Sequence, residues 1–223
     1  MRDAVSSGSD PSETRFGAGC CAAAPIVFGV AALALGQDAN WDLRNYHWYN
    51  PYAWLTDRFT IDVAPATYYN PLLDVPLYVL AQHVPARACS FLLGAMHGLN
   101  FVPLYLLAFS LCPTWARWRA GAGGALIAAV GVTGGGALGL LGTTFYDNVL
   151  SIFVVSAACS AVRALDGTVK RPLMAFAGAG LLVGLATGLK LPVAIFAVGF
   201  AIACLIAPGS IGTRAPYAAC IGP

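Results

Sequence analysis

Six long runs without a charged residue limit what this sequence can fold into. The first covers residues 18–36. At about 1.5 Å of helix per residue, it is long enough to cross a hydrocarbon layer of about 30 Å. A cleavable signal peptide is an alternative for this run, because AALALGQ offers small residues at its end, although further apolar runs follow. The other five runs are 88–112, 121–141, 148–162, 173–189 and 191–207.

The composition agrees with a surface that mostly faces lipid. The chain is 58% hydrophobic and 10% charged, with a mean hydropathy of +0.71, whereas a soluble domain has about 25% charged residues. The twelve Lys and Arg residues are scattered, so no nucleic-acid partner is expected. The seven cysteines have no CxxC spacing and mostly lie in apolar runs, which favours packing over a metal site or a disulfide framework. We predict an all-α, polytopic transmembrane helix bundle of about six spans.

The segment 71–83 decides the orientation of everything after it. It is short and contains Asp74 and Pro76, so we predict a re-entrant or interfacial helix that does not cross the membrane. We further predict that the N-terminus lies in the cytoplasm. The expected location is the cell inner membrane, as a multi-pass protein. In this arrangement eight Lys and Arg residues lie inside and four outside, and the split reverses if 71–83 crosses. The eight are Arg2, Arg15, Arg117, Arg119, Arg163, Lys170, Arg171 and Arg214, and the four are Arg44, Arg58, Arg87 and Lys190.

Three parts are expected along the chain. Residues 1–17 form a disordered cytoplasmic tail, and 18–207 form the membrane domain, which includes an outer loop at 37–71. Residues 208–223 form a tail or the start of a further C-terminal part. Glycines at four-residue spacing inside the domain predict close helix contacts; they are Gly131, Gly135 and Gly139, and Gly180, Gly184 and Gly188.

The outer loop is polar and rich in aromatic residues. The pairs Asn50-Pro51 and Asn70-Pro71 each fit an N-cap followed by Pro at the first helical position, so we predict two or three short helices along the outer membrane surface. Its Trp and Tyr residues either anchor at the headgroups or line a cleft for a sugar or a lipid head. Asp42 and Tyr46 are spaced to share one helix face. Solvated acids are the plain interpretation for the others, Asp38, Asp57 and Asp62.

The predicted orientation places two later turns on the same side as this loop. One turn contains Asp147, and the other contains Lys190 between Gly188 and Pro192. Polar groups from three separate segments are therefore expected to converge there. His97 lies inside a predicted span, where we expect a hydrogen bond to another helix, and His47 is interpreted as an interfacial polar residue.

Several motifs occur in the order of a known family. DLRNY at 42–46 matches an acid and a Tyr that open an outer loop, and Asn70-Pro71 lies where a Pro motif introduces the next hydrophobic segment. Arg87, Asp147 and GLATGLKLP, with Lys190, follow in order. In these features, between about residues 18 and 195, the chain resembles the C-type glycosyltransferase superfamily (GT-C), whose members use polyprenyl-phosphate sugars. It is most similar to the bacterial branch related to protein O-mannosyltransferases and aminoarabinose transferases.

The resemblance implies transfer of a sugar from a polyprenyl-phosphate donor to an acceptor hydroxyl or amine on the outer face. It implies Asp42 as the catalytic base and Lys190 as a phosphate contact. Tyr46, Asp147 and Arg87 are implied as further substrate-binding residues. The alternative without a function for Lys190 is a lysine in a turn, and a similar alternative applies to Arg87. Asp147 has two alternatives to substrate binding: it caps the next helix, or it holds a divalent ion.

Two departures from the family pattern keep other functions open. Leu43 replaces the second acid of the loop motif, and GT-C enzymes are usually longer, so we interpret the chain as a fragment or a shortened relative. The alternative function is a non-catalytic membrane assembly or lipid-binding protein. A transporter fits less well, because His97 is the only ionisable residue well inside a predicted span.

Overall fold

A computed structural model describes residues 11–64, 66–111, 117–207 and 211–221. Within these ranges the chain is helical, with turns and irregular connections but no strands. The helices are α1 (Pro11–Leu35), the π-helix η1 (Leu43–His47), α2 (Tyr49–Leu55), the 3-10 helix η2 (Pro71–Leu73), α3 (Val75–Ala81), α4 (Ala86–Leu99), α5 (Phe101–Leu111), α6 (Arg117–Val132), α7 (Gly135–Gly139), α8 (Asp147–Leu165), α9 (Pro172–Leu189), the 3-10 helix η3 (Leu191–Val193), α10 (Ala194–Ile206) and α11 (Ile211–Ile221).

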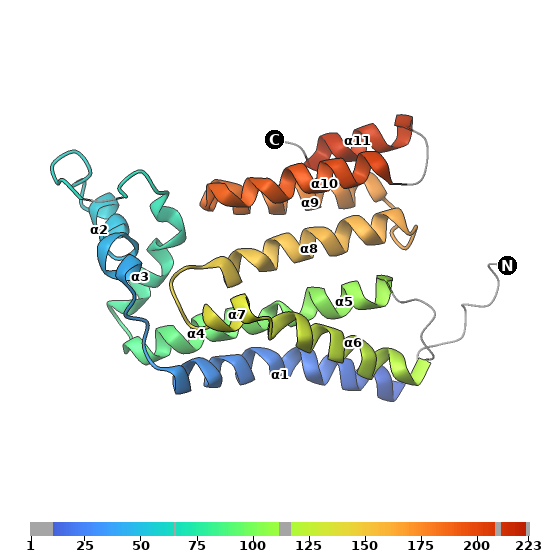
Figure 1. Cartoon of the computed structure of the whole chain (residues 1–223), viewed down its shortest axis with the longest axis horizontal. Coiled ribbons are helices and arrows are strands. Elements are labelled where there is room, and N and C mark those ends of the chain that lie inside the picture. The colour runs from blue at the N-terminus through green and yellow to red at the C-terminus, as the bar shows by residue number, and fades with distance from the viewer. Residues whose placement is uncertain (1–10, 65, 112–116, 208–210, 222–223) are drawn as a thin grey trace.

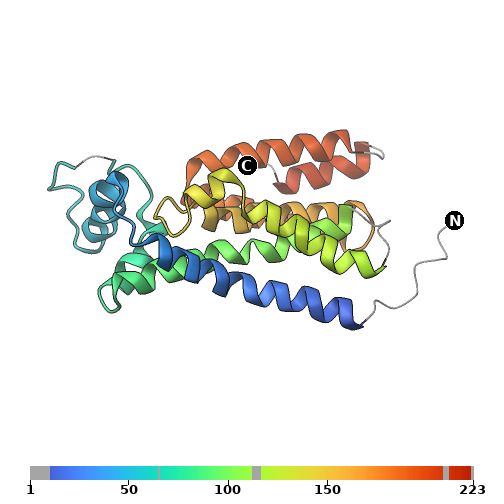
Figure 2. The same cartoon turned by 60° about the horizontal axis from the view of Figure 1, so that its bottom comes forward.

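The longer helices run side by side as a bundle (Figure 1). The short helices α2 and α3 lie together beyond one end of this bundle, and the turned view in Figure 2 agrees. The turn before α8 and the turn between α9 and α10 reach the same end. We call this the loop end, defined by residues 36–85, 140–146 and 188–193. The predicted convergence of three separate segments is therefore present.

Four helices are long and apolar enough to cross a membrane, by length and composition, which indicates a membrane protein. They are Arg15–Leu35, Ala86–Leu111, Asp147–Leu165 and Pro172–Leu189. Two of the six predicted spans, 121–141 and 191–207, instead contain the shorter apolar helices Gly121–Val132 and Leu191–Ile206.

Glycine divides the predicted span 121–141. The helix α6 ends at Val132, and α7 begins after Gly134 as a separate element of five residues. The consecutive glycines Gly134, Gly135 and Gly136 each cost a helix about 1 kcal/mol relative to Ala. A continuous run without charge therefore does not guarantee a continuous helix.

Polar side chains join the helices inside the bundle. The segment Ala86–Leu111 is interrupted at Asn100, three residues before Pro103, which has no N–H for a helix bond. The Asn100 side chain donates hydrogen bonds to the carbonyl oxygens of His97 (3.0 Å) and of Asn148 in α8 (2.7 Å). His97 Nε2 donates to the Val132 carbonyl oxygen in α6 at 2.9 Å. The predicted helix-to-helix hydrogen bond of His97 is thus confirmed.

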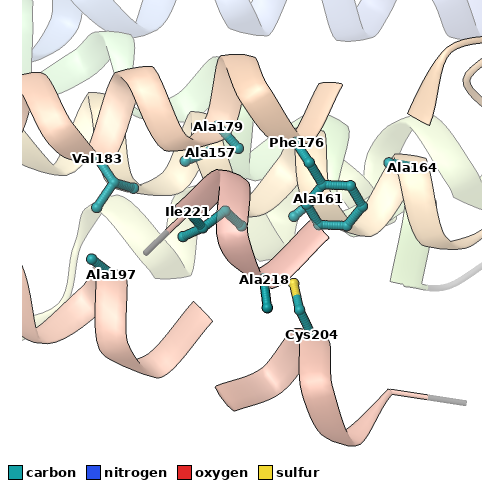
Figure 3. Packing of buried hydrophobic residues seen from close by; sticks show 10 residues of the cluster. All are labelled: Ala157, Ala161, Ala164, Phe176, Ala179, Val183, Ala197, Cys204, Ala218 and Ile221. Carbon is teal, nitrogen blue, oxygen red and sulfur yellow. The ribbon is translucent and has the colours of Figure 1, made fainter. Parts of the chain in front are cut away.

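The last helices of the chain share a buried apolar core, drawn in Figure 3. Phe176 on α9 is fully buried and stacks on Tyr217 of α11, with 4.4 Å between the ring centroids. Ala218 and Ile221 of α11 also lie in this core. Residues 211–221 therefore belong to the helical bundle. A tail does not fit this part of 208–223, and the alternative, the start of a further C-terminal part, stays a prediction.

The N-terminal expectation also needs correction. The helix α1 begins at Pro11, so 11–17 are helical rather than a disordered tail. Proline is favourable at the first helical position because its missing N–H has no partner there in any case. Residues 1–10 lie outside the described residues.

Close helix contacts occur between α9 and α11 at Gly180, one of the glycines that the spacing predicted, and between α1 and α4, where it predicted none. A Cβ atom added at Gly180 would clash with the Cys220 carbonyl oxygen. A Cβ atom added at Gly98 would lie 2.6 Å from the Ala24 carbonyl oxygen, and one added at Gly94 would clash with the Phe28 carbonyl oxygen. At Gly184 an added Cβ would meet none of the described residues within 4 Å. The same is true of Gly135, Gly139 and Gly188, whereas Gly131 and Gly180 do face neighbouring atoms.

Short helices form in the outer loop, but one predicted cap is wrong. Asn70 caps η2: its side chain accepts a hydrogen bond from Leu72 N at 3.0 Å, and Pro71 follows. Asn50 is not a cap, because α2 already begins at Tyr49. Asn50 is fully buried, and its side chain donates to the Ala66 carbonyl oxygen at 3.0 Å.

Substituting leucine at Gly94 should separate α1 from α4. Overpacking of a close contact costs about 1–3 kcal/mol, so Gly94→Leu is expected to lower the melting temperature of the purified protein in detergent. Gly184→Leu is the matched control, since its side chain would enter open space. Equal melting temperatures for the two variants would contradict this account of the packing.

Candidate functional site

A cavity of about 620 Å³ opens at the loop end. This volume lies within the range of about 300–1,000 Å³ typical of small-molecule sites. Its walls come from η1, from the chain entering η2, and from the two turns that meet there. The lining residues are Tyr46, His47, Tyr68, Tyr69, Asn70, Leu73, Asp74, Phe145, Thr187, Gly188, Leu189, Lys190, Leu191 and Pro192.

Lys190 supplies the positive charge in the wall of this cavity. It lies in extended backbone between α9 and η3. Its Nζ donates hydrogen bonds to the Phe145 carbonyl oxygen (3.0 Å) and to Asp147 Oδ1 (2.8 Å). An ammonium group has three N–H donors, so one remains for a ligand oxygen. The predicted proximity of Lys190 and Asp147 is confirmed, and Lys190 is more than a solvated turn residue.

Asp147 begins α8 but does not line the cavity. Tyr146 occupies the N-cap position, and no side chain caps this helix, so the helix-cap interpretation of Asp147 is wrong. Among the described residues no group of three or more His, Cys, Asp or Glu side chains lies together. With its carboxylate already bonded to Lys190, Asp147 does not fit a divalent-ion site.

His47 and Asp74 form the most buried polar pair of the cavity wall. His47 Nδ1 lies 2.7 Å from Asp74 Oδ1, and Asp74 is only 4% exposed. Asp74 sits at the N-cap position of α3, yet its carboxylate makes no cap bond there. The pair thus connects η1 to the start of α3. The interpretation of His47 as an interfacial polar residue stays a prediction.

Tyr146 completes the surroundings of Asp74. It is 5% exposed, and its hydroxyl lies near the Asp74 carboxylate. Burial raises the pKa of Asp74, whereas the hydrogen bonds from His47 and Tyr146 oppose this rise. Burial, together with the nearby Asp74 charge, raises the pKa of Tyr146, so its hydroxyl stays a donor. Tyr146 has a left-handed φ of 59°, which costs a non-glycine residue about 1–2 kcal/mol.

Tyr46 lies beside His47 on η1, with 4.4 Å between the ring centroids. Its hydroxyl lies near the Asp42 carboxylate, which agrees with the prediction that the two residues share one face. Burial and then the Asp42 hydrogen bond raise the pKa of Tyr46. Tyr46 packs on Tyr69 at 5.1 Å, so two aromatic rings form one wall. A π-helix such as η1 is rare and frequently occurs at functional sites.

Three residues implied by the family resemblance lie off this wall, namely Asp147, Asp42 and Arg87. Asp42 is half-buried and reaches the cavity only through its contact with Tyr46. Arg87 is exposed in the first turn of α4 and does not line the cavity. The structure thus brings together Tyr46 and Lys190 in the wall, with Asp42 next to Tyr46 and Asp147 bonded to Lys190.

Asp38 fixes the start of the outer loop to the turn before α8. Its Oδ2 accepts hydrogen bonds from the backbone N and the Oγ1 of Thr144, both at 2.8 Å. Its Oδ1 accepts from the backbone N of Asn40 at 3.0 Å. The interpretation of Asp38 as a solvated acid is wrong. It is wrong for Asp62 too, whose carboxylate binds Arg58 and Tyr49.

Asn70 makes the second connection between the loop and the bundle. Besides capping η2, its side chain donates to the Gly188 carbonyl oxygen at the end of α9, at 2.7 Å. The cavity wall therefore joins segments 118 positions apart in sequence. The sequence indicated a cap and the position of a Pro motif at Asn70, and at Asp74 only a residue that disfavours a span, so it predicted neither long-range contact. An acid within an otherwise apolar segment was the available signal for Asp74.

Asp38→Asn should weaken the loop end. Both Asp38 carboxylate oxygens accept hydrogen bonds, and the substitution replaces one of them with an NH₂ group, which cannot accept. In either orientation of the amide this NH₂ group lies against an N–H donor, and the lost hydrogen bond lowers the stability by about 1–3 kcal/mol. We expect a lower melting temperature in detergent and faster trypsin cleavage at Arg44. Asp57→Asn is the control, because Asp57 is exposed and asparagine tolerates its positive φ of 54°. Wild-type behaviour of Asp38→Asn would overturn this role.

No family model, no curated protein and no solved structure matches this chain.

Proposed function

We propose that this chain is a GT-C-like membrane glycosyltransferase, which moves a sugar from a polyprenyl-phosphate donor to an acceptor on the outer face of the cell inner membrane. The observation in its favour is the cavity at the end of an apolar bundle, which combines the Lys190 ammonium with the Tyr46 and Tyr69 rings. A lipid-linked sugar phosphate needs these groups: a cation for phosphate, flat apolar surfaces for the sugar, and adjacent apolar helices for the chain.

In the proposed arrangement the bundle crosses the membrane six times, with a cytoplasmic N-terminus and the loop end outside. The two shorter apolar helices, Gly121–Val132 and Leu191–Ile206, complete the six. The segment 71–83 does not cross, because it contains only η2 and the seven residues of α3. Large apolar side chains on the helix surfaces then face lipid, among them Ile26, Val30, Leu126, Leu181 and Ile195.

Cysteine labelling tests this orientation. Val63→Cys, in the outer loop, should react with a membrane-impermeant maleimide in intact cells, since Val63 is fully exposed. Thr168→Cys, in the exposed turn between α8 and α9, should react only after permeabilisation. The parent chain measures the background from the native cysteines. The reverse labelling pattern would contradict the orientation.

Lys190 is the proposed phosphate contact, and Asp147 holds it in place. As bonds to the departing phosphate break, negative charge grows on its oxygens, and a fixed ammonium stabilises that charge. Asp42 is proposed to position Tyr46 against the sugar through its hydrogen bond with the Tyr46 hydroxyl. Arg87 is proposed to bind phosphate at the rim of the loop end, outside the cavity wall.

Lys190→Ala should abolish most of the transfer. We expect a loss of about 100-fold in the rate of sugar release from synthetic, radiolabelled polyprenyl-phosphate sugars in proteoliposomes. Lys190→Arg should retain part of the rate because it keeps the charge. Lys170→Ala, at an exposed lysine in the turn between α8 and α9, is the control. An unchanged rate in Lys190→Ala would contradict the assignment.

A non-catalytic lipid-binding protein is the second candidate. The observation in its favour is Leu43, which stands where the family has a second acid. The same donor molecules separate the two functions: saturable binding with no sugar release in wild-type protein would favour the binding protein.

A further inference from the structure

The His47–Asp74 pair is the reactive group of the cavity that the proposed roles leave unused. Both residues line the cavity, and His47 is 12% exposed beside the nearly buried Asp74. A carboxylate can only accept a hydrogen bond, so the ring proton of neutral His47 lies on Nδ1, 2.7 Å from Asp74 Oδ1. The other ring nitrogen, Nε2, then has a free lone pair.

The Nε2 atom of His47 is accessible. It has no hydrogen-bond partner within 11–64, 66–111, 117–207 and 211–221. It is also not among the buried polar atoms that lack a partner. An accessible, unprotonated imidazole nitrogen in a cavity wall is therefore available to a bound molecule.

We infer that His47 takes the proton of the acceptor during transfer, while Asp74 and Tyr146 hold the imidazole in place. The inference rests on the proposed glycosyl transfer and names a residue that the family resemblance did not suggest. Histidine is the commonest general base in enzymes. Asp42, the base implied by the resemblance, reaches the cavity only through Tyr46.

The step balances without a further reactant. The acceptor oxygen attacks the anomeric carbon of the sugar and forms a new C–O bond. The bond between that carbon and the phosphate oxygen breaks, and polyprenyl phosphate leaves with the electron pair. The acceptor proton moves to Nε2, and the resulting imidazolium faces the Asp74 carboxylate, which stabilises its charge. Lys190, on another part of the cavity wall, stabilises the negative charge of the leaving phosphate.

The pair and the charged and titratable groups around it come from several segments of the chain. Asp74 lies between η2 and α3, Tyr146 before α8, and Tyr46 on η1 itself. Lys190, between α9 and η3, acts electrostatically on Asp74. The charges of two further acids raise the pKa values of the tyrosines: Asp42 raises that of Tyr46, and Asp38 raises that of Tyr146.

His47→Asn separates a chemical role from a structural one. The asparagine amide can take the place of Nδ1–H and keep a bond to Asp74, but it offers no proton acceptor at Nε2. We expect about a 100-fold loss of kcat for sugar release from the radiolabelled polyprenyl-phosphate sugars, with little change in KM or melting temperature. His83→Asn, at an exposed histidine after α3, is the control. A folded His47→Asn variant with wild-type kcat would overturn the inference.

The pH profile of the wild-type protein is an independent test of His47 as the base. It can be used even if the His47→Asn variant does not fold. The rate should fall as the pH is lowered from about 8 to about 5, because a proton bound at Nε2 of His47 occupies the lone pair that must accept the acceptor proton. The same fall in Asp42→Asn would assign it to a group other than Asp42. A wild-type rate that is constant over this range would overturn the inference.

Failure of the inference and failure of the proposed function give different results. If the wild-type protein releases sugar and His47→Asn releases it equally fast, only the role of His47 is wrong. If the wild-type protein releases sugar from none of the donors at any pH, the transfer itself is wrong, and the role of His47 falls with it.

Discussion

The buried carboxylate of Asp74 is the constraint on which the loop end depends. A carboxylate with 4% exposure loses most of its hydration, and such a loss is tolerated only when hydrogen bonds replace the water. Here the replacements come from two distant places, His47 on η1 and Tyr146 before α8. The partners of the Asp74 carboxylate therefore hold the outer loop against the bundle, and this contact determines the position of the cavity walls.

Two smaller contacts support the same arrangement from other directions. Asp38 holds the start of the loop to Thr144, and Asn70 holds its end to the Gly188 carbonyl oxygen. The loop is thus attached at both ends and in the middle. Lys190 completes the wall through its bonds to Phe145 and Asp147. Rigid walls suit a site that must keep a cation, a base and aromatic rings at fixed separations.

The sequence was sufficient for features that depend on local chemistry. Uninterrupted apolar length predicted the helical class and six spans, four of which coincide with the long apolar helices. The Asn70-Pro71 pair predicted the start of η2. His97 was recognised because an ionisable group in an apolar helix needs a partner. Asn50-Pro51 has the same local pattern as Asn70-Pro71, yet burial of Asn50 overrides it.

Features that depend on long-range contacts could not be predicted in this way. Spacing showed that Gly180, Gly184 and Gly188 share a face, but not that this face mostly meets no neighbour. Asp38 looked like any loop acid because its partner, Thr144, is 106 positions away. The pairing of His47 with Asp74 likewise depends on how the loop folds back, which neither residue reveals alone.

Photo-crosslinking tests most directly whether this cavity receives a polyprenyl phosphate. A short polyprenyl phosphate with a photoreactive group near the phosphate would be incubated with the protein in liposomes, and the labelled peptides would be identified by mass spectrometry. The account predicts labelling around 46–47, 68–74 and 187–192 that excess unlabelled polyprenyl phosphate removes. Labelling confined to the lipid-facing sides of the helices, or unaffected by the competitor, would contradict it.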